Sequence, residues 1–391
     1  MEMVSGSGAG IHALCDDALA EILVRLPSES VLRCGAVCKS WRRIATAGSF
    51  LAAHAARSPR EMITLAESWT LSAVPLSPGL DAADDGARRR YLCDPSQYDA
   101  NGDWVDCSRV LASLDGLLVL QQRPGLYVVC NPTTRQWTNL PVMAPRPCAA
   151  ASPCGFYRHG PSGEYRLLCH AEEHREPGSS EWKDYYYTLS AGAALPRRLA
   201  PAPAGHPGRR QIGYETPVAH RGTLYWLGTH PVATRTGMML SFRTDSETFR
   251  LVSLPPAGNV SAAALLELDG ALCCVATRGG TPLDIWALQD CDCVAERWTL
   301  RHRVVAPPLP PRGSYCRDFL VNMAISAGGG AILVGMTFSG VIRLYDPKDN
   351  RVKEMELRST PRFLEFRESL VSHAFFQAPR CPELAPIKFP D

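Results

Sequence analysis

The sequence predicts a mainly β protein with a small helical domain at its N-terminus, and three observations lead to this fold class. Apolar residues at helical spacing occur near the start of the chain, between Leu19 and Ile44. From about residue 110 onward, short apolar runs alternate with turn-forming residues instead. Glycine (31 residues) and proline (32 residues) are abundant, as in folds that need many strand connections.

The first predicted helix follows Asp16 and Asp17, where the helix dipole favours negative charge. Its apolar residues recur at intervals of three and four, which places them on one face. They are Leu19, Ile22, Leu23 and Leu26. Pro27 ends this helix because proline cannot continue the hydrogen-bond ladder.

A second predicted helix begins near Ser28 or Ser30, either of which can cap it. Its apolar stripe is formed by Cys34, Val37, Cys38, Trp41 and Ile44. The stretch "GSFLAAHAARS" predicts a third helical segment, with Ser49 as its cap. Three short helices bury too little surface for a stable core of their own. They are therefore either a cap packed on the rest of the chain or a surface that another protein covers.

The stretch from Leu14 to Ile44, "LCDDALAEILVRLPSESVLRCGAVCKSWRRI", resembles an F-box. It has the family's Leu-x-x-Ile-Leu-x-x-Leu-Pro run and an unbroken Val-Cys-Lys-Ser-Trp, while Cys15 stands where the family usually has proline. The resemblance implies three helices that dock on a Skp-type adaptor of a cullin ubiquitin ligase. The residues it implies for adaptor binding are Leu14, Leu19, Ile22, Leu23, Leu26, Pro27, Val31, Leu32, Val37, Cys38 and Trp41.

Behind this stretch, a repeated unit contains a glycine turn, apolar strands and a polar turn. The turn glycines Gly116, Gly163, Gly222, Gly270 and Gly329 are separated by 47, 59, 48 and 59 residues. This spacing suits four-stranded propeller blades, which repeat at roughly 50 residues in the kelch type. The sequence thus predicts a β-propeller-like domain of about six blades, with a large irregular antiparallel β-sandwich as the alternative.

A propeller protects its strand edges by closing its ring. We predict that "RFLEFRESLVSHAFF" (362–376) forms a hairpin and that strands from "REMITLAESWTLSAV" (60–74) complete a sixth blade with it. The polar stretches "NPTTRQW", "TDSETF" and "DPKDNRV" are predicted to join the third and fourth strands of their blades.

Residues 110–375 resemble the F-box-associated domains of plant F-box proteins, through "SLDGLLVL", "CNPTTRQW", "GTLYWL" and "LDIWAL". The resemblance implies a module that recruits a substrate, and it assigns no substrate-binding residue. The predicted division of the chain is a flexible tail, an F-box domain, a connection with the first propeller strands, an F-box-associated propeller-like domain and a C-terminal tail. The respective ranges are 1–10, 11–58, 59–109, 110–378 and 379–391.

Composition argues against several other classes of protein. A net charge of +2 gives no reason to expect a nucleic acid, and no apolar run approaches the roughly 20 residues of a membrane helix. The start of the chain has no signal-peptide pattern, so the 15 cysteines are expected to be reduced thiols of a cytoplasmic or nuclear protein.

No motif predicts a metal site, a cofactor or a catalytic residue. The cysteines lack paired Cys-x-x-Cys spacing, and no Gly-x-Ser-x-Gly elbow is present. The stretch "CHAEEHREPGSSE" (169–181) is interpreted as a solvated loop.

We therefore expect a non-catalytic substrate adaptor of a Skp–cullin–F-box ubiquitin ligase, which recruits a target protein for ubiquitination. The first alternative is a propeller that binds proteins outside any ligase and uses its helices only as a cap. The second is a propeller enzyme or glycan binder, which no motif in the sequence supports.

Overall fold

The computed structural model describes most of the chain. The described ranges are 14–66, 70–77, 89–95, 97–98, 104–105, 110–123, 125–143, 152–174, 182–201, 216–227, 237–256, 262–277, 283–289, 297–305, 323–335, 341–346, 351–382 and 384–390. The predicted tail, residues 1–10, lies outside them.

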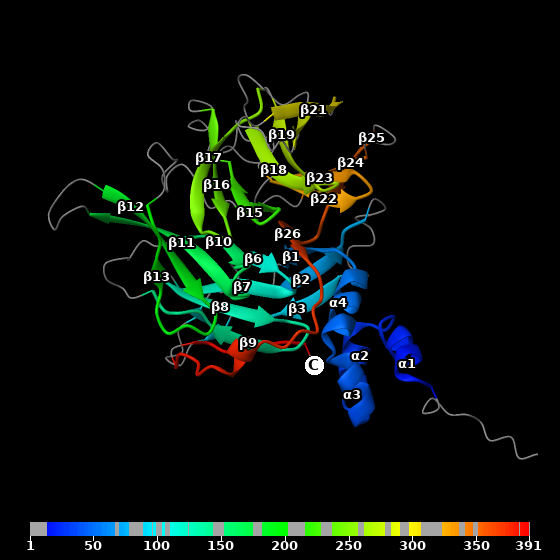
Figure 1. The fold of residues 1–391 in the computed structure, drawn as a ribbon. Coiled ribbons are helices and arrows are strands. Elements are labelled where there is room, and N and C mark those ends of the chain that lie inside the picture. Colours follow the sequence, from blue (N-terminus) through cyan, green and yellow to red (C-terminus); the bar gives the residue numbers. More distant parts are fainter. Residues whose placement is uncertain are drawn as a thin grey trace, which may run out of the picture.

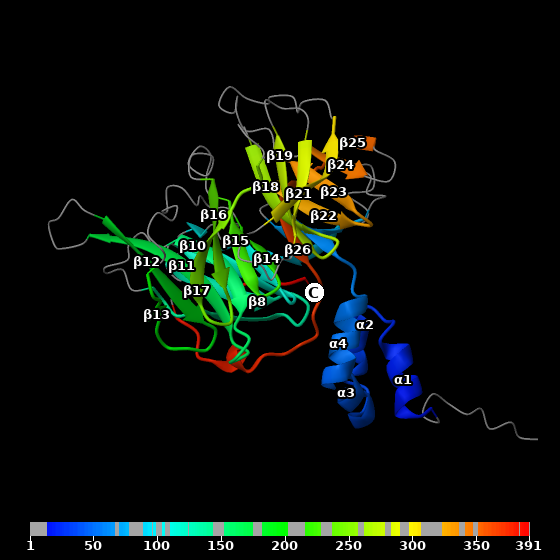
Figure 2. The same cartoon turned by 45° about the horizontal axis from the view of Figure 1, so that its top comes forward.

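The N-terminal domain contains four short helices beside a propeller (Figures 1 and 2). They are α1 (Asp16–Leu23), α2 (Ser28–Cys34), α3 (Lys39–Ala45) and α4 (Gly48–Arg57). Their shared core consists of Leu19, Leu23, Val24, Val31, Ile44, Ala45 and Phe50.

The prediction of three helices was wrong, because the second predicted helix is two helices. Cys38 has an extended backbone (φ −155°), so the helical ladder cannot pass through it. Its sulfur accepts a hydrogen bond from the backbone N–H of Trp41 at 3.5 Å and caps α3. The predicted serine caps were also wrong. Ser28 is the first residue of α2 behind Pro27, and Ser49 lies inside α4.

The rest of the chain forms a ring of six four-stranded antiparallel sheets, and the prediction of about six blades is confirmed. The β-sandwich alternative is wrong, because each apolar cluster of the described ring joins two adjacent sheets. The first four-stranded blade along the chain contains β6 (Val110–Leu114), β7 (Leu117–Arg123), β8 (Leu126–Asn131) and β9 (Gln136–Asn139).

Four further blades follow in sequence order, each listed from its innermost to its outermost strand. They are β10 (Ser152–Arg158), β11 (Tyr165–His174), β12 (Trp182–Ser190), β13 (Arg197–Arg198); β14 (Val218–His220), β15 (Thr223–Trp226), β16 (Met238–Arg243), β17 (Thr248–Ser253); β18 (Ala262–Leu268), β19 (Ala271–Thr277), β20 (Leu283–Gln289), β21 (Arg297–Val304); and β22 (Met323–Gly328), β23 (Ala331–Gly335), β24 (Val341–Asp346), β25 (Arg351–Glu356). A separate hairpin pairs β4 (Gln97–Tyr98) with β5 (Trp104–Val105).

Both ends of the chain build the closing blade, as predicted. Its order is β26 (Thr360–Phe366), β1 (Glu61–Leu65), β2 (Leu71–Pro75) and β3 (Arg90–Cys93). The prediction of a hairpin at 362–376 was wrong, because this stretch contains one strand followed by the 3-10 helix η3 (Ala374–Gln377). The Asn131 side-chain amide donates hydrogen bonds to the carbonyls of Ser369 (2.9 Å) and Val371 (3.2 Å). These carbonyls of the segment after β26 are therefore paired with a side chain and not with a second strand.

The five turn glycines occupy equivalent positions, each between the innermost and second strands of a blade. All five have positive φ, between 62° and 80°, which favours glycine. A side chain at Gly116 is excluded as well, since its Cβ would lie 2.3 Å from that of Ser369. Two of the predicted polar turns join β8 to β9 and β16 to β17. The third lies mostly at 347–350, outside the described residues.

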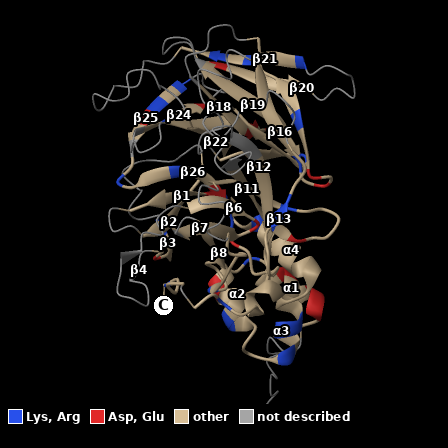
Figure 3. Ribbon diagram, turned by 90° about the vertical axis from the view of Figure 1, so that its left-hand side faces the viewer, with Lys and Arg blue, Asp and Glu red and all other residues tan. Residues whose placement is uncertain are grey.

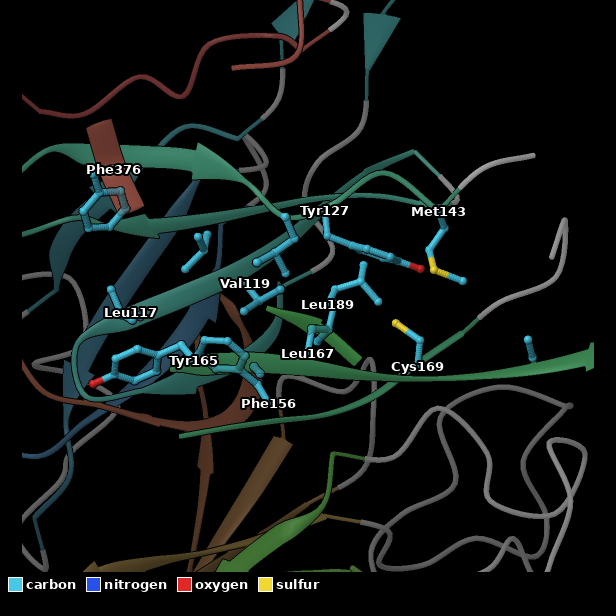
Figure 4. Close-up of a cluster of buried hydrophobic side chains, with 14 residues drawn as sticks. Leu117, Val119, Tyr127, Met143, Phe156, Tyr165, Leu167, Cys169, Leu189 and Phe376 are labelled. Carbon is cyan, nitrogen blue, oxygen red and sulfur yellow. The ribbon is translucent and has the colours of Figure 1, made fainter. Parts of the chain in front are cut away.

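Apolar residues fill the spaces between adjacent blades. Figure 4 shows one such cluster, in which Val119 and Tyr127 of one blade face Tyr165 and Leu167 of the next. Phe376 of η3 closes one end of this cluster and is 5% exposed. The C-terminal segment therefore contributes to the core between blades.

Residues 380–388 continue along the outside of the ring, between the closing blade and the blade that contains β9. The guanidinium of Arg380 lies 4.2 Å from the ring centre of Trp137. The side chain of Gln122 donates to the carbonyl of Ala385 (2.6 Å) and accepts from its N–H (3.1 Å). Ile387 is buried in the core of the closing blade. We call residues 379–391 the C-terminal strap.

Candidate functional site

The helical domain exposes an apolar patch made of residues that the F-box resemblance selected. Exposed fractions are 41% for Leu14, 43% for Ile22, 43% for Leu32 and 60% for Val37, and Pro27 is also exposed. Among the described residues, eight large apolar side chains are exposed, and four of them belong to this patch. The helical domain, a small part of the chain, thus carries half of the exposed large apolar side chains of the described residues. We call Leu14, Ile22, Pro27, Leu32 and Val37 the helical patch.

The other predicted adaptor-binding residues lie inside the helical domain or at its margin. Leu19, Leu23 and Val31 are at most 4% exposed and form its core. Leu26, Cys38 and Trp41 are half-buried, and Leu26 and Trp41 pack against that core. These six side chains therefore hold the helices that present the patch.

Charged side chains fix the position of α1 against α3. Asp16 pairs with Arg43, and Ser40 donates a hydrogen bond to Asp16 at 3.2 Å. The hydrogen bond from Arg43 lowers the pKa of the Asp16 carboxyl. Figure 3 shows the acidic residues of α1 close to the basic residues of α3. These contacts link the start of α1 to α3.

The carboxylate of Glu368 links the helical domain to the propeller. The hydroxyl of Ser28, which is 1% exposed, donates to Oε2 of Glu368 at 2.6 Å. The other oxygen of Glu368 lies 2.9 Å from a guanidinium nitrogen of Arg90 in β3. Arg90 also pairs with Glu61, whose pKa is raised because burial outweighs the effect of Arg90. Leu370 packs against the helical core.

Sequence reasoning missed this junction. Ser28 and Glu368 are 340 residues apart, and neither occurs in a motif that pairs them. The one local signal was the serine after Pro27, which the sequence predicted to be a helix cap.

A cavity of about 1240 Å³ runs along the propeller axis and is lined by the innermost strands of all six blades. Helix α4 lines it at one end with Gly48, Leu51, Ala52 and Ala55. At this end, Glu365 lies 2.6 Å from Arg60 and 3.1 Å from Arg367. Burial alone raises the pKa of Glu365, but the two arginines outweigh it and the net shift is downward. The charges at this rim are thus paired with one another.

The two ends of the propeller differ. The helices join β1 at the end where the turns between innermost and second strands lie, because Glu61 pairs there with Phe366 at the end of β26. The connections between consecutive blades lie at the opposite end. Exposed Val142 (43%) and Val305 (82%) follow β9 and β21, at that opposite end.

One predicted loop is partly a strand. Residues Cys169–His174 of "CHAEEHREPGSSE" belong to β11 and pair with β12, and residues 175–181 lie outside the described ones. His170 is 2% exposed, with its ring centre 5.0 Å from that of Tyr186. The solvated-loop interpretation was therefore wrong for the first half of this stretch, where apolar and aromatic neighbours extend the strand.

Metal-ligating clusters and membrane-spanning helices are both absent from the described part of the chain. No group of three or more histidine, cysteine, aspartate or glutamate residues there is placed to hold a metal ion. None of its helices is long and apolar enough to cross a membrane.

Comparisons with known proteins agree with this architecture. Residues 11–51 match the model of the F-box domain, and residues 87–378 match that of the F-box associated beta propeller domain. In Arabidopsis thaliana, F-box protein At5g49610 is 25% identical over 320 residues, covering 73% of this chain and 77% of its own length. F-box protein At3g07870 of the same plant is 24% identical over 390 residues, covering 92% and 91%. Among solved structures, YjhT is similar with a TM-score of 0.40 and 11% identity, covering 63% of this chain and 82% of its own.

The matched propeller model spans most of the chain and follows directly behind the F-box match. The chain therefore belongs to the F-box proteins that carry an F-box-associated β-propeller domain.

Proposed function

We propose that this protein is the substrate receptor of a Skp–cullin–F-box ubiquitin ligase and has no catalytic residue of its own. Its helical domain binds a Skp-type adaptor and, through it, a cullin and a RING subunit. Its propeller binds a target protein. The helical patch is the observation that carries this proposal, because an F-box that exposes four large apolar side chains has a surface prepared for a partner.

Positioning accounts for the contribution to catalysis. A receptor that holds a target beside the ubiquitin-charged enzyme raises the local concentration of the target's lysine amines. The rate gain comes from proximity, so the receptor needs neither a cofactor nor a metal.

We propose further that the target binds the end of the propeller opposite α4. At the α4 end, residues of α4 line the cavity, and Glu365 pairs with Arg60 and Arg367. The opposite end carries exposed Val142 and Val305, which are apolar side chains without cover in the described structure.

We also propose that the protein resides in the cytoplasm or nucleus, since its ten described cysteines are free thiols, as in reducing compartments.

Co-expression with a Skp-type adaptor, followed by size-exclusion chromatography, tests the proposal. We expect a stoichiometric complex that is lost when Ile22, Leu32 and Val37 are replaced by serine. The matched control is Leu195→Ser, because Leu195 is 78% exposed but lies on the propeller. A monodisperse chain that elutes apart from the adaptor would refute the proposal.

The alternative is a protein-binding propeller with a helical cap outside any ligase. The observation that favours it is the junction itself, since α4 covers one end of the cavity and Ser28 is tied to Glu368. A cap of this kind predicts no adaptor complex and no effect of the three serine substitutions on any interaction.

A further inference from the structure

The basic residues of this chain are divided very unevenly between the two types. Of the 41 lysines and arginines, five are lysines, at positions 39, 183, 348, 353 and 388, and 36 are arginines. Lysine is normally among the commonest residues of soluble domains. The chain therefore keeps its positive charge while using very few amines.

At some positions the structure requires arginine. Arg303 holds both carboxylate oxygens of Asp284, at 2.7 and 3.0 Å. Arg380 stacks on Trp137, and Arg90 lies over the ring of Phe366 at 5.6 Å while it pairs with two glutamates. A lysine cannot replace a planar fork or a stacked guanidinium.

At other positions the structure gives no such reason. Arg57, Arg135, Arg297 and Arg301 are exposed, and within the described structure their side chains make no hydrogen bond or ion pair. Arg25 pairs with Glu21 at 3.6 Å, and Arg33 with Glu29 at 2.5 Å, each one turn along a helix. Lysine forms pairs of this kind equally well. What distinguishes arginine at these positions is its chemistry rather than its contacts.

Ubiquitin transfer depends on that chemistry. A neutral lysine amine attacks the carbonyl carbon of the thioester between ubiquitin and its carrier enzyme. A C–N isopeptide bond forms, the C–S bond breaks, and the proton lost by nitrogen balances the thiolate that leaves. A guanidinium stays protonated at neutral pH and offers no nucleophilic nitrogen. An arginine surface is therefore charged but cannot accept ubiquitin.

We propose that the scarcity of lysine protects this receptor from modification by its own ligase, and that exposed Lys353 and Lys388 are its self-acceptor sites in the described structure. This inference rests on the proposed function. Lys353 lies on the outer strand β25 and Lys388 on the C-terminal strap, both at the perimeter of the propeller. Lys39 lies next to Cys38 at the start of α3, where a bound adaptor would limit access to its amine.

The test is self-ubiquitination in a reconstituted ligase containing the full chain, the adaptor, a cullin–RING module, the activating and conjugating enzymes, and ubiquitin. The test variant carries Arg57→Lys, Arg135→Lys, Arg297→Lys and Arg301→Lys, which preserve the charge at positions whose side chains have no hydrogen bond or ion pair to other described residues. The matched control carries glutamine at the same four positions. A second variant, Lys353→Arg/Lys388→Arg, removes the proposed acceptors. Complex formation is verified for each chain by size-exclusion chromatography before ubiquitin is added.

We expect the four-lysine variant to be modified roughly twofold faster than the wild type, because four exposed amines join the five present. The glutamine control should match the wild type, and Lys353→Arg/Lys388→Arg should be modified more slowly than the wild type. An intact complex in which the added lysines are not modified would overturn the inference and leave a bias of the coding sequence toward arginine as the explanation. A chain that forms no complex with the adaptor would refute the proposed function, and this inference with it.

Discussion

Replacing Ile22, Leu32 and Val37 by serine should separate adaptor binding from folding. These side chains are 43%, 43% and 60% exposed, so about half of each is still available for burial by a partner. Complete burial of one such side chain is worth roughly 1.5–3 kcal/mol, and the available half is therefore worth roughly 1 kcal/mol. Together the three substitutions should cost about 3 kcal/mol, which is roughly a hundredfold increase in Kd.

Isothermal titration calorimetry of the purified chain with the adaptor measures this change, and thermal unfolding measures any loss of stability. Exposed positions of this kind usually change the free energy of unfolding by less than about 0.5 kcal/mol. Leu195→Ser, on the propeller, should leave both quantities unchanged. A triple variant that binds within about threefold of the wild-type Kd would refute the assignment of the patch, since that corresponds to less than about 1 kcal/mol. Leu26→Ala/Trp41→Ala is a poorer probe, because both side chains pack against the helical core and their loss also destabilises the domain.

Three further predictions concern the ties that hold the domains and the ring together. Glu368→Ala leaves the buried hydroxyl of Ser28 without its acceptor, so the distribution of distances between spin labels on α4 and on the propeller should broaden. An unchanged distance distribution would show that packing alone holds the helical domain in place. Removing residues 379–391 leaves the side chain of Gln122 without its partner Ala385 and uncovers the core of the closing blade. The free energy of unfolding, measured by chemical denaturation, should fall by about 2–4 kcal/mol. A truncated chain with the same denaturation midpoint and slope as the full chain would contradict a stabilising role of the strap. Glu247 lies in the turn between β16 and β17 and accepts hydrogen bonds from Tyr157, Arg197 and Arg166 of the neighbouring blade. Burial alone raises the pKa of Glu247, but these hydrogen bonds outweigh it and lower the pKa. The ionised Glu247 therefore contributes its full stabilisation above the ordinary glutamate pKa of 4.5, and this stabilisation is lost as the pH falls below that pKa. Acidification should narrow the difference in the free energy of unfolding between the wild type and Glu247→Gln. A difference that stays constant from pH 7 to pH 3 would argue against a role of these hydrogen bonds in stability.

Local patterns predicted much of the fold. The turn glycines specified the blade repeat because each sits in a left-handed conformation that other residues avoid. They also mark the boundary between the innermost and second strands, so the sequence repeat begins one strand later than the blade does. The helix boundaries were less predictable. A continuous apolar stripe from Cys34 to Ile44 hides the break at Cys38, where a sulfur caps α3 in place of an oxygen.

The candidate site was predicted as a set of residues but not as a surface. Spacing and resemblance selected eleven residues without separating those that are exposed from those that face the helical core. That separation depends on how the four helices pack, which buries Leu23 and leaves neighbouring Ile22 in water. The patch therefore follows from tertiary packing, although each of its members was named in advance.

By itself the sequence determined the order of the domains, the six-blade repeat and the arginine-rich surface, because turn geometry, apolar spacing and side-chain chemistry are local properties. Only the tertiary structure decided how the ring closes, since β26 and β1 meet across almost the whole chain. It alone brought Ser28 to Glu368 and placed residues of α4 in the lining of the cavity. Contacts between residues hundreds of positions apart depend on the register and packing of every blade between them, and a local sequence pattern does not contain that information.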